Sequence, residues 1–150
     1  MYVLPIAFGT PAFDEALYLR HLVLRVPLGR TFHAADIARE WASVHLGTYA
    51  AGGQLLGVLT LLPLTAGRVK MRQVAVAESA RRKGVGRQLV AASEEWATAN
   101  GYAEMVLHAR EVAVAFYDKL GYARVGERFM EVGIPHYKMC KHLPAGRRDL

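Results

Sequence analysis

The chain has one cysteine, Cys140, among its 150 residues, which excludes an internal disulfide. We interpret Cys140 as a small apolar strand residue, because no activating motif surrounds it. No apolar run approaches the roughly 18 residues that a membrane-spanning helix requires. The first eight residues lack a basic start and a small-residue cleavage site, so we expect no signal peptide. These absences predict a cytoplasmic protein that does not bind membranes.

The sequence also lacks the Gly-x-x-x-x-Gly-Lys-Ser/Thr string of a Walker loop and any aromatic-interleaved RNA motif. The formal net charge of +6 is consistent with an anionic ligand and does not specify nucleic acid, because most basic residues are scattered. With 53% hydrophobic and 21% charged residues, the composition is that of a globular protein. We expect one domain over residues 1–150 with a mobile tail after residue 144.

One glycine-containing segment concentrates basic charge. It reads Arg81, Arg82, Lys83, Gly84, Val85, Gly86 and Arg87. A strand-like run, Val74-Ala75-Val76, precedes it, and a helix-period apolar pattern starts at Val85. The glycines therefore stand where a helix begins, with unpaired N–H groups and a positive dipole end. Because glycine permits close backbone approach, the segment predicts a pyrophosphate-binding loop.

The dinucleotide fingerprint fits this loop in part, since Glu104 lies about 20 residues on, but the large Leu89 occupies the third small position. The loop resembles more closely the Arg/Gln-x-x-Gly-x-Gly/Ala signature of the GNAT family of N-acetyltransferases, through Arg81, Gly84 and Gly86. That resemblance implies that residues 81–87 bind the pyrophosphate of acetyl-coenzyme A. A basic, solvated helix start is the alternative interpretation.

A second segment, Phe116-Tyr117-Asp118-Lys119-Leu120-Gly121-Tyr122, resembles the Phe-Tyr-x-x-Leu-Gly-Phe/Tyr segment of the same family. The resemblance implies that Tyr117 protonates the departing coenzyme A thiolate. Val112, Phe116 and Leu120 repeat at four-residue intervals, which predicts a buried stripe with Tyr117 at its edge. The alternative is a half-buried tyrosine that bonds a backbone carbonyl.

The resemblance implies further site residues. A backbone N–H of Val74 or Val76 would bond the acetyl oxygen, and the pantetheine arm would lie between splayed strands at 68–76 and 103–109. Arg110 occupies the position where many relatives have an asparagine that bonds this arm. His108 is the candidate general base, because it lies late in the strand at 103–109 and its residue type transfers protons near neutral pH. The alternatives are a structural histidine, which is at least as well supported, and a water relay that makes a single base unnecessary. Weaker candidates are Glu40 and His45.

The segment 129–139 is similar to the Phe-x-Glu-x-Gly-Ile-Pro-His-x-x-Met ending of a bacterial GNAT subgroup related to the YjcF and ElaA proteins. We expect no metal, and interpret the glutamate and histidine beside Pro135 as a loop-stabilising polar pair. The order of expected elements is strand, two helices, three strands, helix, strand, helix and two strands. This is the GNAT order, an α/β (α+β) fold with a mixed, mostly antiparallel sheet of about seven strands, four helices and splayed central strands.

These observations predict an acetyl-coenzyme A-dependent N-acetyltransferase that acts on a primary amine of a small molecule or peptide by direct attack in a ternary complex. A non-catalytic acyl-coenzyme A-binding regulatory domain is the alternative, and a nucleotide- or nucleic-acid-binding module is a third interpretation. We expect a homodimer, because the terminal strands are apolar and the family pairs through this region. The alternative is a monomer whose terminal strands pack internally.

Overall fold

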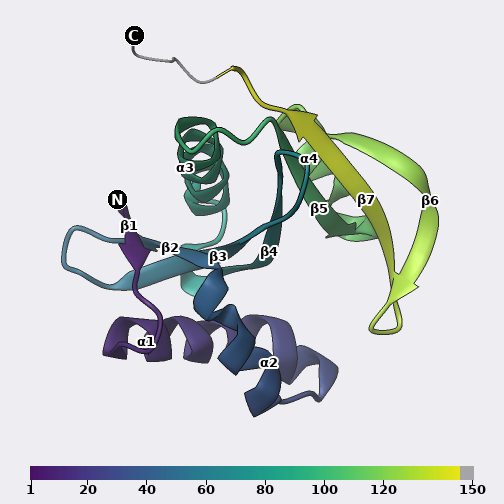
Figure 1. The fold of residues 1–150 in the computed structure, drawn as a ribbon. Coiled ribbons are helices and arrows are strands. Elements are labelled where there is room, and N and C mark those ends of the chain that lie inside the picture. The colour runs from purple at the N-terminus through teal and green to yellow at the C-terminus, as the bar shows by residue number, and fades with distance from the viewer. Residues whose placement is uncertain (146–150) are drawn as a thin grey trace, which may run out of the picture. The chain divides into compact units, whose positions relative to one another are not determined.

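The computed structural model describes residues 1–145, so the tail expected to be mobile after residue 144 lies almost wholly outside the described residues. The helices and strands, in chain order, are β1 (Tyr2–Ile6), α1 (Pro11–Arg20), α2 (Ala34–Ala38), β2 (Val44–Tyr49), β3 (Leu55–Pro63), β4 (Arg68–Val76), α3 (Val85–Ala99), β5 (Glu104–Arg110), α4 (Val114–Lys119), β6 (Ala123–Glu131) and β7 (Ile134–His142) (Figure 1). The seven strands follow the order β1-β2-β3-β4-β5-β7-β6. The expected mixed sheet with four helices is confirmed.

Backbone contacts divide the chain into two compact units. The first contains residues 1–62 and 73–93, and the second contains residues 63–72 and the chain from residue 94 onward. One boundary between the units falls after Arg72, within β4, and another falls after Ser93, within α3. Each of these two elements therefore contributes residues to both units.

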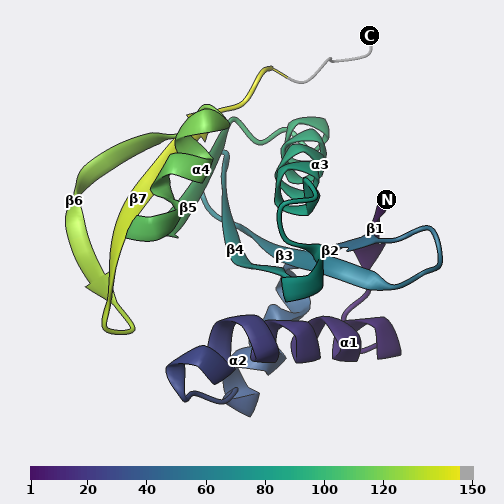
Figure 2. The same ribbon diagram turned by 180° about the vertical axis from the view of Figure 1, so that it is seen from behind.

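In the first unit, strands β1, β2 and β3 form an antiparallel sheet against α1 (Figure 2). Phe13, Ala16 and Leu19 of α1 pack against Ile6 and Val58 of the strands. Thr10 caps α1, because its hydroxyl accepts a hydrogen bond from the Phe13 N–H at 3.3 Å. Strand alternation places Gly57 on the opposite face, where the start of α3 packs. The sheet of this unit therefore has a helix against each face.

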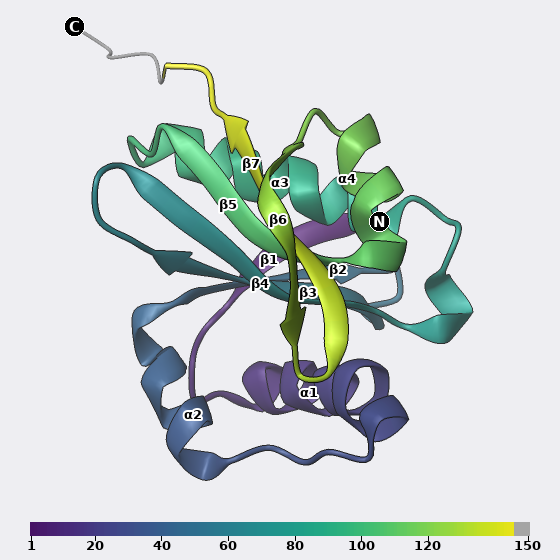
Figure 3. The same cartoon turned by 90° about the vertical axis from the view of Figure 1, so that its right-hand side faces the viewer.

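In the second unit, β5 pairs in parallel with β4 and antiparallel with β7, and β6 continues the sheet beyond β7 (Figure 3). Val132 (φ 48°) and Gly133 (φ 74°) join β6 to β7, and two successive positive φ angles are typical of a tight hairpin turn. The β4–β5 ladder runs from Arg68 opposite Glu104 to Met71 opposite Leu107. Both strands continue beyond that point, β4 to Val76 and β5 to Arg110.

Helix α4 covers one face of the second unit's sheet. Lys141 of β7 points to that face, because its ammonium donates to the Leu120 carbonyl at the end of α4 (2.8 Å) and to Glu94 of α3 (2.7 Å). Residues of odd number in β7 share this face, and those of even number, from His136 to His142, lie on the other. No helix within residues 1–145 combines the length and the apolar character needed to cross a membrane.

Candidate functional site

The glycine-containing basic loop begins helix α3, as the sequence predicts. Residues 81–84 form a turn, and α3 starts at Val85 and continues for 15 residues. Gly84 has φ 80° and its carbonyl accepts the first helical hydrogen bond, from the Gln88 N–H at 3.0 Å. A Cβ on Gly84 would meet nothing within 4 Å, so the backbone there is open. The first N–H groups of a long helix thus lie at an accessible glycine, which is the arrangement that binds phosphate groups.

The charged side chains of the loop are all exposed, namely those of Arg81, Arg82, Lys83 and Arg87. Arg82 has φ 64°, a left-handed conformation that is uncommon outside glycine. Val85, in contrast, is buried and anchors the loop to the first unit, since the Gly57 backbone lies against its side chain. The loop therefore combines a buried anchor at Val85 with exposed positive charge.

Strand β4 is irregular just before residues 74–76, where a backbone N–H of Val74 or Val76 is predicted to bond the acetyl oxygen. Gln73 has φ 54°, and its side-chain oxygen accepts a hydrogen bond from Arg25 at 3.0 Å. The three residues after it differ in burial: Ala75 is buried, whereas Val74 and Val76 are half-buried. A positive φ in the middle of a strand interrupts regular pairing, as at a β-bulge.

Tyr117 lies on α4 in the second unit and is buried, with 7% of its surface exposed. Its ring contacts the rings of Phe116 and Tyr122 edge-on, at centroid distances of 5.0 and 5.7 Å. Burial raises the pKa of Tyr117 to about 12, because the phenolate would lose its hydration. Within residues 1–145 the hydroxyl makes no hydrogen bond. The phenol is thus held protonated, with its proton uncommitted to another described group.

The predicted apolar stripe on this helix is wrong. Val112 is 92% exposed and belongs to a 3-10 turn before α4, and Phe116 is 38% exposed. Tyr117 is instead the buried residue of α4. The helix has only six residues, so the turn that precedes it changes the angular spacing on which the prediction relied.

His108 lies on β5 within a polar cluster that the strand register assembles. Its Nδ1 donates to Glu131 Oε1 at 3.1 Å, and Glu131 Oε2 lies 3.4 Å from His136 Nε2. The sequence placed Glu131 and His136 together as a polar pair but gave no signal that His108, which lies 23 residues upstream of Glu131, would join them. In the described part of the chain, no group of three or more such side chains is arranged to hold a metal ion.

His108 and Tyr117 lie on opposite faces of the second unit's sheet. His108 pairs in register with Lys138, an even-numbered residue of β7, whereas α4 packs on the face of Lys141. Arg110 ends β5 on the same face as His108, opposite His136, and is half-buried. The predicted general acid, Tyr117, and the predicted general base, His108, therefore lie on different faces of this sheet.

The two weaker base candidates both have structural roles in the first unit. Glu40 accepts two hydrogen bonds from Arg20, at 2.7 and 2.8 Å, and Arg20 is 2% exposed. His45 is buried, with Nδ1 at 3.1 Å from the Thr60 hydroxyl and Nε2 at 3.0 Å from the Glu40 carbonyl. Burial lowers the pKa of His45, although its hydrogen bond to Glu40 opposes the change. Neither side chain is available to accept a proton from an amine.

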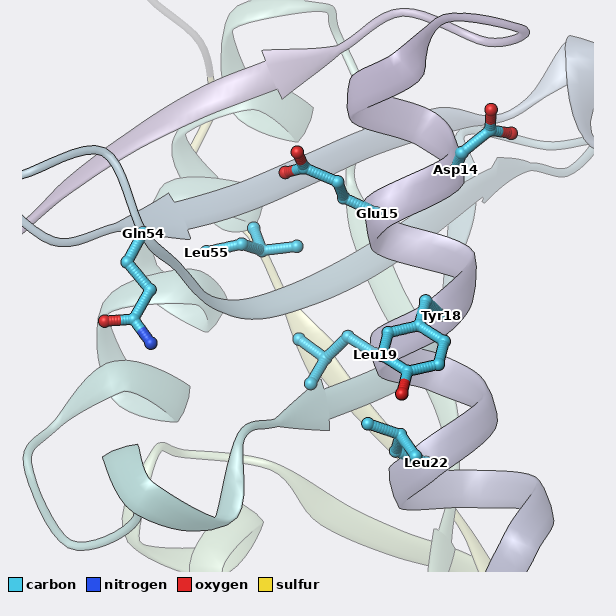
Figure 4. Close-up of a pocket in the computed structure, with 7 residues that line it drawn as sticks. All are labelled: Asp14, Glu15, Tyr18, Leu19, Leu22, Gln54 and Leu55. Carbon is cyan, nitrogen blue, oxygen red and sulfur yellow. The ribbon is translucent and has the colours of Figure 1, made fainter.

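A surface pocket of about 580 Å³ lies elsewhere in the first unit, between α1 and the start of β3 (Figure 4). Its lining residues are Asp14, Glu15, Tyr18, Leu19, Leu22, Gln54 and Leu55. The leucines provide an apolar floor, and two carboxylates lie among the lining groups. It includes none of the residues predicted for coenzyme binding or catalysis.

Comparison with known proteins connects these features to a family. The family model for the acetyltransferase (GNAT) domain matches residues 30–143. The Bacillus subtilis N-acetyltransferase YjcF, itself uncharacterized, is 37% identical over 87 residues, which cover 53% of this chain and 62% of YjcF. The chain spans about half the length of several of the curated relatives that it matches.

Solved structures agree over nearly the whole chain. A proposed N-acetyltransferase from Lactobacillus plantarum is 27% identical, with a TM-score of 0.81 over 95% of this chain and 98% of that one. An aminoglycoside 6′-N-acetyltransferase in complex with coenzyme A is 18% identical, with a TM-score of 0.81 over 99% of this chain and 100% of that one, and shares the fold.

The chain belongs to the GNAT family of acetyltransferases. Its resemblance to the YjcF subgroup is also confirmed.

Proposed function

We propose that this GNAT acetyltransferase transfers an acetyl group from acetyl-coenzyme A to a primary amine of a small molecule or peptide, by direct attack in a ternary complex. The observation that carries the proposal is the open, positively charged loop at the start of α3, where Gly84 exposes the first helical N–H groups. A pyrophosphate carries the charge and the acceptor oxygens that such a helix end binds.

In the proposed reaction the amine nitrogen attacks the thioester carbonyl carbon, and the carbon–sulfur bond breaks. A backbone N–H of Val74 or Val76 would donate to the acetyl oxygen, on which negative charge develops. Tyr117 would give its proton to the departing thiolate, and His108 would accept the proton that the amine loses. Ala75 would lie beside the acetyl group, and Arg110 would lie beside the pantetheine arm. The pyrophosphate loop would be completed by Arg81, Arg82, Lys83, Val85, Gly86 and Arg87.

A ligand panel tests the proposal. We expect acetyl-coenzyme A to raise the melting temperature, whereas NAD and a short oligonucleotide should not, because a ligand stabilises the folded state by mass action. A screen of amines with thiol-release detection would then identify the acceptor. Binding without turnover of any amine would favour the acyl-coenzyme A-binding regulatory domain, and stabilisation by the oligonucleotide would favour a nucleic-acid-binding module.

We also propose a homodimer and a cytoplasmic location. Strand β6 supports the dimer, because it is an edge strand whose residues are mostly exposed, among them Val125 and Met130 at 47% and 61%. Light scattering at micromolar concentration would measure the mass, and the mass of a monomer would contradict the dimer.

A further inference from the structure

Glu131 of β6 lies between two histidines, and its hydrogen bond to His108 determines which nitrogen of that imidazole carries the proton. We propose that Glu131 is a positioning residue for His108: it holds the His108 proton on Nδ1 and so leaves Nε2 as the atom that accepts a proton from the amine. Proton acceptance by Nε2 rests on the proposed function. The Nδ1 tautomer rests on the contacts among His108, Glu131 and His136.

Strand register brings the members together on one face. His108 of β5 lies opposite Lys138 of β7, and His136 is two residues from Lys138, so both imidazoles lie on that face. Phe129 of β6 lies opposite His136, and Glu131 is two residues further along β6. Four side chains from three strands therefore meet away from the face that α4 covers.

The hydrogen bond between His108 and Glu131 selects one tautomer. A carboxylate oxygen can only accept, so His108 Nδ1 must carry the hydrogen that bridges the 3.1 Å to Oε1. In the neutral ring the second nitrogen, Nε2, then has the free lone pair. His108 is 27% exposed on its side chain, whereas His136 is 5% exposed, so His108 is the imidazole that a substrate can approach.

His136 lies on the other side of the carboxylate. Its Nδ1 donates to the Ile134 carbonyl at 2.7 Å, which fixes the ring, and its Nε2 faces Glu131 Oε2 at 3.4 Å. Phe129 packs between the two imidazoles, stacked on His136 at 5.9 Å and edge-on to His108 at 5.0 Å. The His108 ring is thus held both at one nitrogen and against an aromatic face.

The charges around Glu131 keep it ionised. Partial burial acts to raise the pKa of Glu131, but the His108 hydrogen bond and the charges of His108, His136 and Lys70 outweigh it, and the pKa is lowered. Lys70 approaches from β4, and Lys138 lies beside His108 on β7. A carboxylate at this place stabilises the positive charge that His108 gains when it takes up a proton.

The experiment uses the 150-residue chain and two independent readouts. Nitrogen-15 NMR of the imidazoles should show neutral His108 protonated at Nδ1 in the wild type, and protonated mainly at Nε2 in Glu131→Ala. With an acceptor from the amine screen, Glu131→Ala should lower kcat by at least about 10-fold, a fraction of the 10²–10⁴-fold typical of general acid–base catalysis. Glu131→Gln, which keeps an oxygen acceptor, should restore the Nδ1 tautomer and part of kcat.

Rescue by Glu131→Gln separates positioning from packing. The amide oxygen can accept from Nδ1 as the carboxylate does, whereas the alanine side chain cannot. Glu111→Ala is the matched control, because Glu111 pairs with Arg128 at 3.1 Å and both side chains are about half exposed. It should leave the tautomer and kcat unchanged.

A wild-type protein with neutral His108 protonated at Nε2, or a Glu131→Ala variant with unchanged kcat and an unchanged tautomer, would overturn the inference. If the wild type turned over no amine, the proposed function would fail, and the NMR readout would still decide whether Glu131 positions His108.

Discussion

A Cβ placed on Gly57 of β3 would lie 2.7 Å from Cγ1 of Val85, the first residue of α3. It would also lie 3.0 Å from the Leu89 side chain and 3.3 Å from the Ala75 carbonyl oxygen. The absent side chain at Gly57 therefore lets the start of α3, which follows the basic loop, pack directly on strand β3.

Gly57→Ala should lower the free energy of unfolding by about 1–3 kcal/mol, because Val85 is β-branched and a backbone oxygen closes the other side. Urea unfolding would measure the change. Gly52→Ala is the control, since a Cβ there meets nothing within 4 Å. Equal stability of the two variants would show that α3 can shift without cost.

Gly86→Val should weaken acetyl-coenzyme A binding while the fold persists. Gly86 is the second residue of α3, where added bulk would obstruct the approach of a pyrophosphate to the helical N–H groups. Isothermal titration would measure the affinity, with Ala91→Val on an exposed part of the same helix as the control. Unchanged affinity in Gly86→Val would mean that the coenzyme binds elsewhere. Single arginine replacements in the loop should matter less, because exposed charges are screened.

Tyr117→Phe should reduce kcat by roughly 10²–10⁴-fold with nearly unchanged coenzyme affinity, since it removes a proton donor and keeps the ring. Because burial raises the pKa of Tyr117 to about 12, its deprotonation should not set the basic limb of the pH profile below that range. Steady-state kinetics against pH would test both points, with Tyr102→Phe as the control. A wild-type rate, with chemistry rate-limiting, would assign thiolate protonation to water.

Glu40→Gln should destabilise the protein by about 3–5 kcal/mol, because it leaves the buried Arg20 guanidinium without its carboxylate. The kcat of the folded variant should stay unchanged, because Glu40 takes no part in the proposed chemistry. Asp36→Asn, which alters an exposed carboxylate of α2, is the control. A loss of kcat without a loss of stability would place Glu40 in the reaction instead.

Local patterns in the sequence were sufficient for most of the fold. The helix start at the glycines of the basic loop and the bounds of β4 both depend on neighbouring residues, and both predictions are confirmed. The buried face of the short helix α4 was predicted wrongly. Six residues are too few to show a helical period, and the turn before them has a different angular spacing. Its burial pattern follows from packing against Tyr122, five residues after Tyr117.

The sequence alone located the glycine-containing basic loop at the start of α3, because glycine, positive charge and the beginning of a helical apolar pattern are neighbours in the chain. The polar cluster was decided by the tertiary structure, because the pairing of β5, β7 and β6 is what brings Glu131 to His108. A shift of one residue in that register would move His108 to the other face of the sheet and separate the two groups. Contacts between distant residues depend on strand pairing, which no local pattern specifies.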